Sequence, residues 1–308
     1  MHREAEEGVA IADVEQATGI ARATLRIWER RYGFPQPGRD ARGERNYPLD
    51  QVRKLRLIAD LLARGHRPGR LMQLDAGELA LLVPAAGPRA AASGEPAVAD
   101  PVLAPLRAHD VPAVLRLLED AVRKMGLAGF ITERMPDMNT NVGLAWARGQ
   151  LEVYEEHLYS ELVQQVVRAH LAQVPAPAPA AVRGPRVLLA TLPPETHALG
   201  LLMVHCLLTL EACPCISLGT RVPLAQLVTA ASAFRADVVG LSFTASMNPR
   251  LVLRGLEQLR AELPPTVAIW AGGSSPVLAR HRLGGVQVMP HLRDALPALA
   301  HWRQSHAA

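Results

Sequence analysis

Residues 186–200 read RVLLATLPPETHALG, and this stretch decides the fold of the C-terminal part of the chain. It is an apolar strand-like run, then a short loop, then the start of an apolar helix. The loop contains His197, with Glu195 two residues before it and Gly200 three residues after it. A carboxylate that holds one imidazole nitrogen leaves the other free for a metal, so this spacing fits a metal-ligating histidine. Taken alone, it equally fits a solvated loop histidine.

Four further apolar runs follow, at residues 215–218, 237–242, 267–270 and 286–289. Each is short, lacks polar alternation and is followed by a helical segment, as in a parallel sheet covered on both faces. Five such strands predict a flavodoxin-like, doubly wound sheet with strand order 2-1-3-4-5. The ligand crevice is then expected at the carboxyl ends of the first, third and fourth strands.

The ends of the third and fourth strands carry residues suited to a ligand. Ser242 and Thr244 offer hydroxyl groups after the third strand, while Gly272 and Gly273 follow the fourth. Glycines let a ligand lie directly on the backbone. The chain has no GxGxxG or P-loop motif at these ends, which disfavours nucleotide binding.

Basic residues gather near the N-terminus. Residues 19–75 hold 13 Lys/Arg against 6 Asp/Glu, 13 − 6 = +7, whereas the whole chain has a net charge of only +4. Short helices over residues 11–19 and 21–31, joined by a glycine-containing turn, predict a helix-turn-helix. A solvated basic face on an ordinary helical domain is the alternative; the order of charge, turn and wing favours binding of double-stranded DNA.

The second of these helices is the expected recognition helix. Arg22, Thr24 and Arg26 are placed to meet base edges, while Leu25, Ile27 and Trp28 are expected to pack inward. A turn-rich hairpin follows, on which Arg39, Arg42 and Arg45 are expected to contact phosphates.

Two alanine- and proline-rich segments divide the chain. We expect a DNA-binding domain at residues 1–80, a linker at 81–98, a helical domain at 99–173, a linker at 174–183 and the sheet domain at 184–308. Helices at 101–125, 127–133, 140–149 and 153–172 predict a four-helix bundle. Trp146, Glu156 and His157 stand out in it, although a core tryptophan and a solvated acidic helix start would look the same.

Other features limit the class of protein. The three cysteines form neither an even framework nor a CxxC pair, so we expect reduced, buried thiols in a cytoplasmic protein. The acidic start predicts no signal peptide, and no apolar run of about 20 residues predicts a membrane span.

The N-terminal motifs resemble a known family. Residues 9–75, with TLRIWERRYG at 24–33 and RNYPLDQV at 45–52, look like the winged-helix DNA-binding domain of MerR-family regulators. The resemblance adds Arg30, Arg31 and Tyr32 to the expected DNA-binding residues and implies dimers on promoter DNA. The chain departs from metal-sensing members, because no long dimerisation helix follows and no cysteine lies near residue 80.

The three strand ends resemble the cobalamin-binding domain of methionine synthase and the mutases, whose pattern is Asp/Glu-x-His-x-x-Gly, a serine-containing strand end and Gly-Gly. The resemblance implies that His197 is the lower axial ligand of cobalt and that Glu195 orients it. The displaced nucleotide tail would then run past Gly200, Ser242, Thr244, Gly272 and Gly273.

The order of the three units resembles the CarH/LitR class of light-responsive regulators. Trp146, Glu156 and His157 match that class's Trp-x9-Glu-His motif, which implies a bundle capping the upper face of adenosylcobalamin. In the class, a dark tetramer blocks a promoter until light breaks the cobalt–carbon bond and the tetramer falls apart. For this chain the resemblance implies a homo-oligomer, dimer or tetramer. A histidine that often follows the tryptophan is replaced here by Ala147, which cannot bind cobalt.

The resemblance therefore implies a DNA-binding repressor, not an enzyme. A cobalamin-dependent mutase or methyltransferase would need a substrate barrel of about 250 residues, which this chain lacks. A light-independent cobalamin sensor and a cobalamin-independent regulator stay open because of Ala147.

Overall fold

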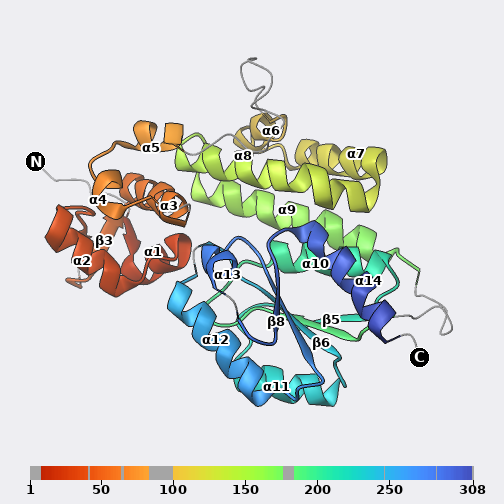
Figure 1. Cartoon of the computed structure of the whole chain (residues 1–308). Coiled ribbons are helices and arrows are strands. Elements are labelled where there is room, and N and C mark those ends of the chain that lie inside the picture. Colours follow the sequence, from red (N-terminus) through yellow and green to blue (C-terminus); the bar gives the residue numbers. More distant parts are fainter. Residues whose placement is uncertain are drawn as a thin grey trace, which may run out of the picture.

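The computed structural model describes residues 8–40, 42–63, 66–82, 100–175, 184–245, 247–281 and 283–306. Three units follow one another along the chain: an N-terminal unit of helices with a small sheet, a helical unit, and an α/β unit (Figure 1). Most of both predicted linkers lies outside the described residues, so the proposed domain boundaries stay predictions.

The N-terminal unit is a helix-turn-helix with a wing. Helices α1 (Ile11–Thr18) and α2 (Arg22–Tyr32) are separated by Gly19, whose φ of 67° closes α1 with a bond from its N–H to the carbonyl of Glu15. The wing pairs β2 (Gly38–Arg39) with β3 (Arg45–Pro48), and β1 (Gly8–Ala10) pairs with the other edge of β3. Strand β1 was not expected. Helices α3 (Leu49–Ala63), α4 (Pro68–Leu71) and α5 (Ala76–Leu82) complete the unit.

One inward-facing prediction for α2 is wrong. Leu25 is fully buried and Trp28 is 6% exposed, but the side of the helix that carries Ile27 is open and this residue is 49% exposed. Residues three apart share a helix face, whereas Ile27 is two residues from Leu25 and one from Trp28. Ile27 therefore lies on the outer surface of the recognition helix, next to Arg26.

The helical unit differs from the prediction at its start. In place of one helix over 101–125, the chain forms α6 (Leu103–Arg107) and α7 (Val111–Gly129). The break occurs because His109 has a φ of 54° and the Asp110 side chain caps α7 by accepting from the N–H of Ala113. A π-helical turn, Phe130–Arg134, leads directly into α8 (Met135–Ala147), and α9 (Val153–Ala172) follows. The predicted helix 127–133 is therefore not a separate helix; it belongs to the kinked helical segment that runs from α7 through the π-helical turn into α8.

The C-terminal unit has the predicted topology. Strands β4 (Val187–Ala190), β5 (Cys215–Ser217), β6 (Val238–Ser242), β7 (Ala268–Gly272) and β8 (Val286–Met289) form a parallel sheet in the order β5-β4-β6-β7-β8. That is the order 2-1-3-4-5 within the unit, so the flavodoxin-like prediction is confirmed. The connecting helices are α10 (Leu199–Leu210), α11 (Leu224–Ala233), α12 (Pro249–Glu262) and α13 (Pro276–Arg280), and α14 (Ala295–Ser305) ends the fold.

The units share hydrophobic packing. One continuous cluster of buried side chains extends from Val14 of α1 through Leu55 of α3 and Trp146 of α8 to Leu207 of α10. A second cluster, which includes Leu259, fills the α11–α12 face of the sheet. Cys206 and Cys213 are buried free thiols as expected, whereas Cys215 on the edge strand is only partly buried. In the described part of the chain, every helix is too short or too polar to cross a membrane.

Candidate cofactor site and nucleic-acid interface

The loop between β4 and α10 holds His197 by a short network. Nδ1 of His197 lies 2.5 Å from Oε1 of Glu195, and the same oxygen accepts the backbone N–H of His197 at 3.0 Å. Glu195 is 3% exposed, while the His197 side chain is 44% exposed. The carboxylate therefore fixes the ring through Nδ1 and leaves Nε2 as the nitrogen that can bind a metal.

Thr244 supports this carboxylate from the end of β6. Its backbone N–H and its hydroxyl both donate to Oε2 of Glu195, at 2.8 and 2.6 Å. Burial alone would raise the pKa of the Glu195 carboxyl, but the hydrogen bond and charge of His197 and the two bonds from Thr244 lower it to about 2. Glu195 is therefore an anion at neutral pH, as a carboxylate that supports a metal-binding imidazole must be.

A cavity of about 400 Å³ opens beside this loop at the carboxyl edge of the sheet. Four of the predicted cofactor residues line it: Gly200, Ser242, Gly272 and Gly273. Thr244 does not belong to this lining; it contacts the Glu195 carboxylate instead.

Glycine is required at two of these positions. A Cβ at Gly200 would lie 2.9 Å from Oγ of Ser242, which joins the start of α10 closely to the end of β6. Gly273 has a φ of 110°, and a Cβ there would overlap the carbonyl oxygen of Phe243. The bare backbone at Gly272 and Gly273 forms part of the cavity wall.

Sequence reasoning missed part of the lining. Thr132 and Pro136, from the helical unit, close the cavity, and residues 289–293 after β8 form another wall, with His291 and Arg293 among them. The end of the fifth strand carried no glycine or hydroxyl pattern that would have marked it. Thr191 was also missed; its hydroxyl donates to the carbonyl of Glu195 at 2.9 Å and steadies the loop.

The predicted upper-face residues lie near the end of α8 and the start of α9. Trp146 is 2% exposed and its indole Nε1 is buried without a hydrogen-bond partner. Nδ1 of His157 lies 2.9 Å from Oε2 of Glu156, and the His157 side chain is largely exposed. Glu155, by contrast, is structural, because its carboxylate closes the capping box of α9 and contacts His109.

A residue of the N-terminal unit completes this group. The guanidinium of Arg56, on α3, lies 4.2 Å from the centroid of the Trp146 ring, and its Nη2 is 3.9 Å from Oε1 of Glu156. Arg56 lies about ninety positions before Trp146, so nothing in the local sequence indicated this contact.

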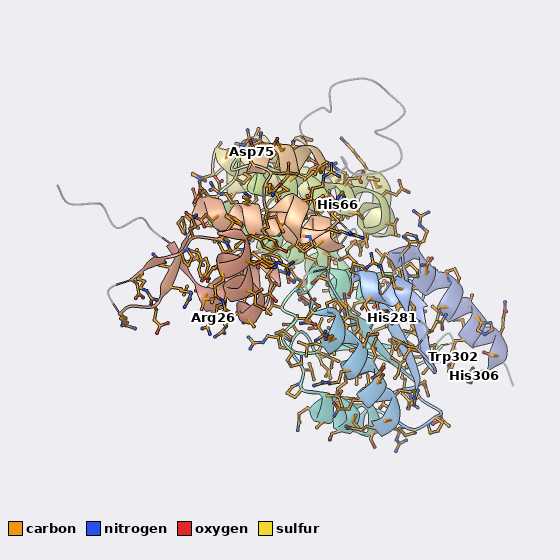
Figure 2. The ribbon with its side chains drawn as sticks, turned by 60° about the vertical axis from the view of Figure 1, so that its left-hand side comes forward. Arg26, His66, Asp75, His281, Trp302 and His306 are labelled. Carbon is orange, nitrogen blue, oxygen red and sulfur yellow. The ribbon has the colours of Figure 1, made fainter. Side chains whose placement is uncertain are left out.

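The predicted DNA-binding residues lie on α2 and the wing. Figure 2 shows Arg26 on the side of the N-terminal unit opposite Asp75. Six of the arginines are exposed: Arg22, Arg26, Arg30, Arg31, Arg39 and Arg42. Thr24 and Tyr32 are half-buried, and Arg31 stacks over the Tyr32 ring with 5.3 Å from its guanidinium carbon to the ring centroid.

Arg45 holds the wing in place. Its Nε is 3.1 Å from Oε2 of Glu29, and the Tyr47 hydroxyl donates to the other oxygen of Glu29 at 2.6 Å. This pairing ties β3 to α2 and leaves Arg39 and Arg42 as the exposed cations of the hairpin.

The residues present fit a cobalamin. His197 presents Nε2 as a nitrogen ligand, and a largely apolar cavity with glycine walls lies beside it for a flat heteroaromatic tail. The buried, unpartnered Nε1 of Trp146 is a donor that the described side chains leave unsatisfied. The fit rests on both the sheet unit and the helical unit.

Family comparisons match all three units. Residues 9–76 match the MerR HTH family regulatory protein family, residues 185–300 match the B12 binding domain, and residues 98–170 match a second B12 binding domain family. A solved structure, the monomethylamine corrinoid protein of Methanosarcina barkeri, is similar with a TM-score of 0.51 at 18% identity, over 66% of this chain and 97% of that protein. At that identity the likeness shows the fold.

Two Myxococcus xanthus proteins are similar along most of their length. The HTH-type transcriptional repressor CarH is 32% identical over 278 residues, 88% of this chain and 90% of CarH. The HTH-type transcriptional repressor CarA is 32% identical over 267 residues, 86% of this chain and 86% of CarA. The chain therefore belongs to the CarH-like class of MerR-type transcription regulators that carry B12-binding domains.

Proposed function

We propose that this protein is a DNA-binding repressor that holds adenosylcobalamin between its helical and sheet units and responds to light through it. The observation that carries the proposal is the fixed imidazole of His197, oriented through Nδ1 by an anionic, buried Glu195 beside the cavity. A solvated loop histidine would not have a buried carboxylate held by two further hydrogen bonds from Thr244.

On the lower side, Nε2 of His197 would be the nitrogen that the chain offers to cobalt. Glu195 holds Nδ1 and prevents the ring from turning. The cavity lined by Gly200, Ser242, Gly272 and Gly273 accepts the nucleotide tail, whose base His197 replaces.

On the upper side, Trp146 would pack over the corrin, and Glu156 and His157 would contact the same face. Adenosylcobalamin supplies a cobalt–carbon bond that visible light breaks. Without the upper group, α8 and α9 would lose contacts that favour their packing against the sheet unit, and an oligomer surface that spans both units would change with it. Ala147, the last residue of α8, has a methyl side chain that cannot bind cobalt.

The proposed regulated activity is binding to double-stranded promoter DNA. The exposed face of α2 presents Arg22, Arg26 and Arg30 for the major groove, and Arg39 and Arg42 on the wing neutralise phosphates. We propose that a homo-oligomer, dimer or tetramer, binds DNA in the dark and releases it when lit.

The test mixes the purified full chain with adenosylcobalamin in the dark and follows its absorption spectrum, its size-exclusion profile and its binding to promoter DNA before and after green light. We expect a bound cobalamin spectrum, a dark oligomer that becomes smaller when lit, and loss of DNA binding. Absence of dark binding refutes the cofactor, and binding without any change of size or DNA affinity refutes the light switch.

His197→Ala tests the proposed lower ligand. Removal of the imidazole should weaken retention of cobalamin by at least about 100-fold, because the cofactor then keeps only its contacts with the cavity and the upper face. Dark titration of the variant by absorption measures the loss. Arg26→Ala is the control: it should keep wild-type cobalamin binding and weaken DNA binding, and the reverse pattern would contradict the assignment of the two units.

A second function is favoured by Ala147. Without a histidine at position 147 to bind cobalt after photolysis, the chain would serve as a cobalamin sensor without a light response. In that case adenosylcobalamin and hydroxocobalamin would change DNA binding equally, and illumination would change nothing.

A further inference from the structure

The upper-face tryptophan is covered by the DNA-binding unit. Trp146 is 2% exposed, and the Arg56 guanidinium of α3 lies 4.2 Å from the centre of its ring. A ring covered to this degree offers no free face to a ligand. Any molecule that packs on Trp146 must therefore first displace what covers it.

A second arginine of α3, Arg53, contacts the segment between α8 and α9. Nη2 of Arg53 is 2.7 Å from Oε2 of Glu152, the residue that caps α9. Its Nη1 approaches Gly149 so closely that a Cβ there would lie 3.2 Å away. Together with the 3.9 Å approach of Arg56 to Glu156, two cations of α3 face two carboxylates at the start of α9. In Figure 1, α3 lies against the end of the helical unit where α8 and α9 meet.

From these contacts we infer that α3 is an internal cap on the upper face, and that cobalamin and the Arg53/Arg56 contacts exclude one another. The inference rests on the proposed function, since it requires the corrin to reach Trp146. Binding of the cofactor must break the arginine contacts, and by linkage the contacts must weaken the binding of the cofactor by the same factor.

The docked α3 affects how the DNA-binding surface is oriented relative to the helical unit. The recognition helix carries Arg26 on the side of the unit opposite Asp75 (Figure 2), and its arginines are exposed while α3 is docked. Docking therefore leaves the DNA-binding surface open but fixes its direction relative to the helical unit. Cobalamin frees the N-terminal unit to turn, so that two units of an oligomer can meet two half-sites.

The experiment titrates the wild-type full chain, Arg56→Ala and Arg53→Ala with adenosylcobalamin in the dark and measures the dissociation constant by absorption. Loss of the partly exposed cation–π contact, or of the partly exposed Arg53–Glu152 pair, should tighten binding by about threefold in either variant. Arg70→Ala is the matched control, an exposed arginine of α4 in the same unit, and it should bind as the wild type does.

Hydrogen exchange of the wild type supplies a second readout. Adenosylcobalamin should raise exchange in residues 149–152, because Arg53 lies against Gly149 and Glu152, and Arg53→Ala should show the raised exchange without cofactor. Wild-type or weaker affinity in both arginine variants, with cobalamin still bound by the wild type, overturns the internal cap alone. If the wild type binds no adenosylcobalamin, the proposed function fails and the cap fails with it.

Discussion

At the scale of single residues, the candidate site depends on a chain of contacts that ends at His197. Thr244 donates twice to Glu195, and Glu195 in turn contacts both the ring and the backbone N–H of His197. The sequence indicated Glu195 and His197 because their spacing is local. It placed Thr244 on the ligand instead of on the carboxylate, because a contact across 49 residues depends on how the two strand ends face one another.

Thr244→Val tests this chain of contacts. The change keeps the shape and the backbone N–H but removes the hydroxyl that donates to Glu195, so His197 is less firmly oriented. We expect the affinity for cobalamin to fall by about tenfold, as measured by dark titration. Thr229→Val, which removes an exposed hydroxyl on α11, should bind as the wild type does. Unchanged affinity in Thr244→Val would mean that the backbone bond alone holds the carboxylate.

Gly273→Ala tests the backbone that forms the cavity wall. The residue adopts a φ of 110°, and the added methyl group would overlap the carbonyl oxygen of Phe243. We expect the free energy of unfolding to fall by about 1–3 kcal/mol, measured by urea denaturation. At Gly284 a Cβ would meet open space, so Gly284→Ala should change stability by less than about 0.5 kcal/mol. Equal effects of the two substitutions would contradict the strain at Gly273.

At the scale of secondary-structure elements, strands were more predictable than helices. The five apolar runs and their order are set by short-range hydrophobicity and by the handedness of parallel crossovers, and both were correct. The helix boundary at residues 107–111 was missed because it depends on a left-handed His109 and a capping Asp110, which a count of apolar spacing does not register. Ile27 was misplaced because an apolar residue beside the core residue Trp28 was assumed to be core as well.

Leu25→Ala and Ile27→Ala separate the two faces of α2. Leu25 is fully buried, so its truncation should lower the free energy of unfolding by about 2–5 kcal/mol. Ile27 is 49% exposed, so its truncation should cost less than about 0.5 kcal/mol but weaken binding to promoter DNA. Thermal unfolding and a DNA titration at fixed salt measure the two effects. A large stability loss in Ile27→Ala would contradict the observed orientation.

At the scale of the whole molecule, the units are less independent than the alanine- and proline-rich segments suggested. Composition separates the units along the chain, but it carries no information about which faces meet. One hydrophobic cluster runs from α1 through α3 and α8 to α10. The sequence therefore predicted what each unit is, and missed that α3 and the helical unit are packed together.

Leu55→Ala tests this shared packing. Leu55 of α3 is fully buried in the common cluster, so its truncation should speed hydrogen exchange in α8 as well as in α2. Leu259→Ala is the control, since this equally buried residue of α12 belongs to the separate cluster under the sheet and should spare α8. Exchange in α8 that is unaffected by Leu55→Ala would show that the N-terminal unit opens on its own.

The approach of Arg53 to Gly149 and Glu152 limits how such a regulator can be re-engineered. A hybrid that replaces residues 8–82 with the DNA-binding domain of another operator-binding protein would bring a foreign helix against α8 and α9. Unless that helix supplies arginines at the positions of Arg53 and Arg56, the hybrid would bind its operator but would lack the proposed cap over Trp146. New operator specificity is therefore best grafted onto α2 and the wing alone, with α3 retained.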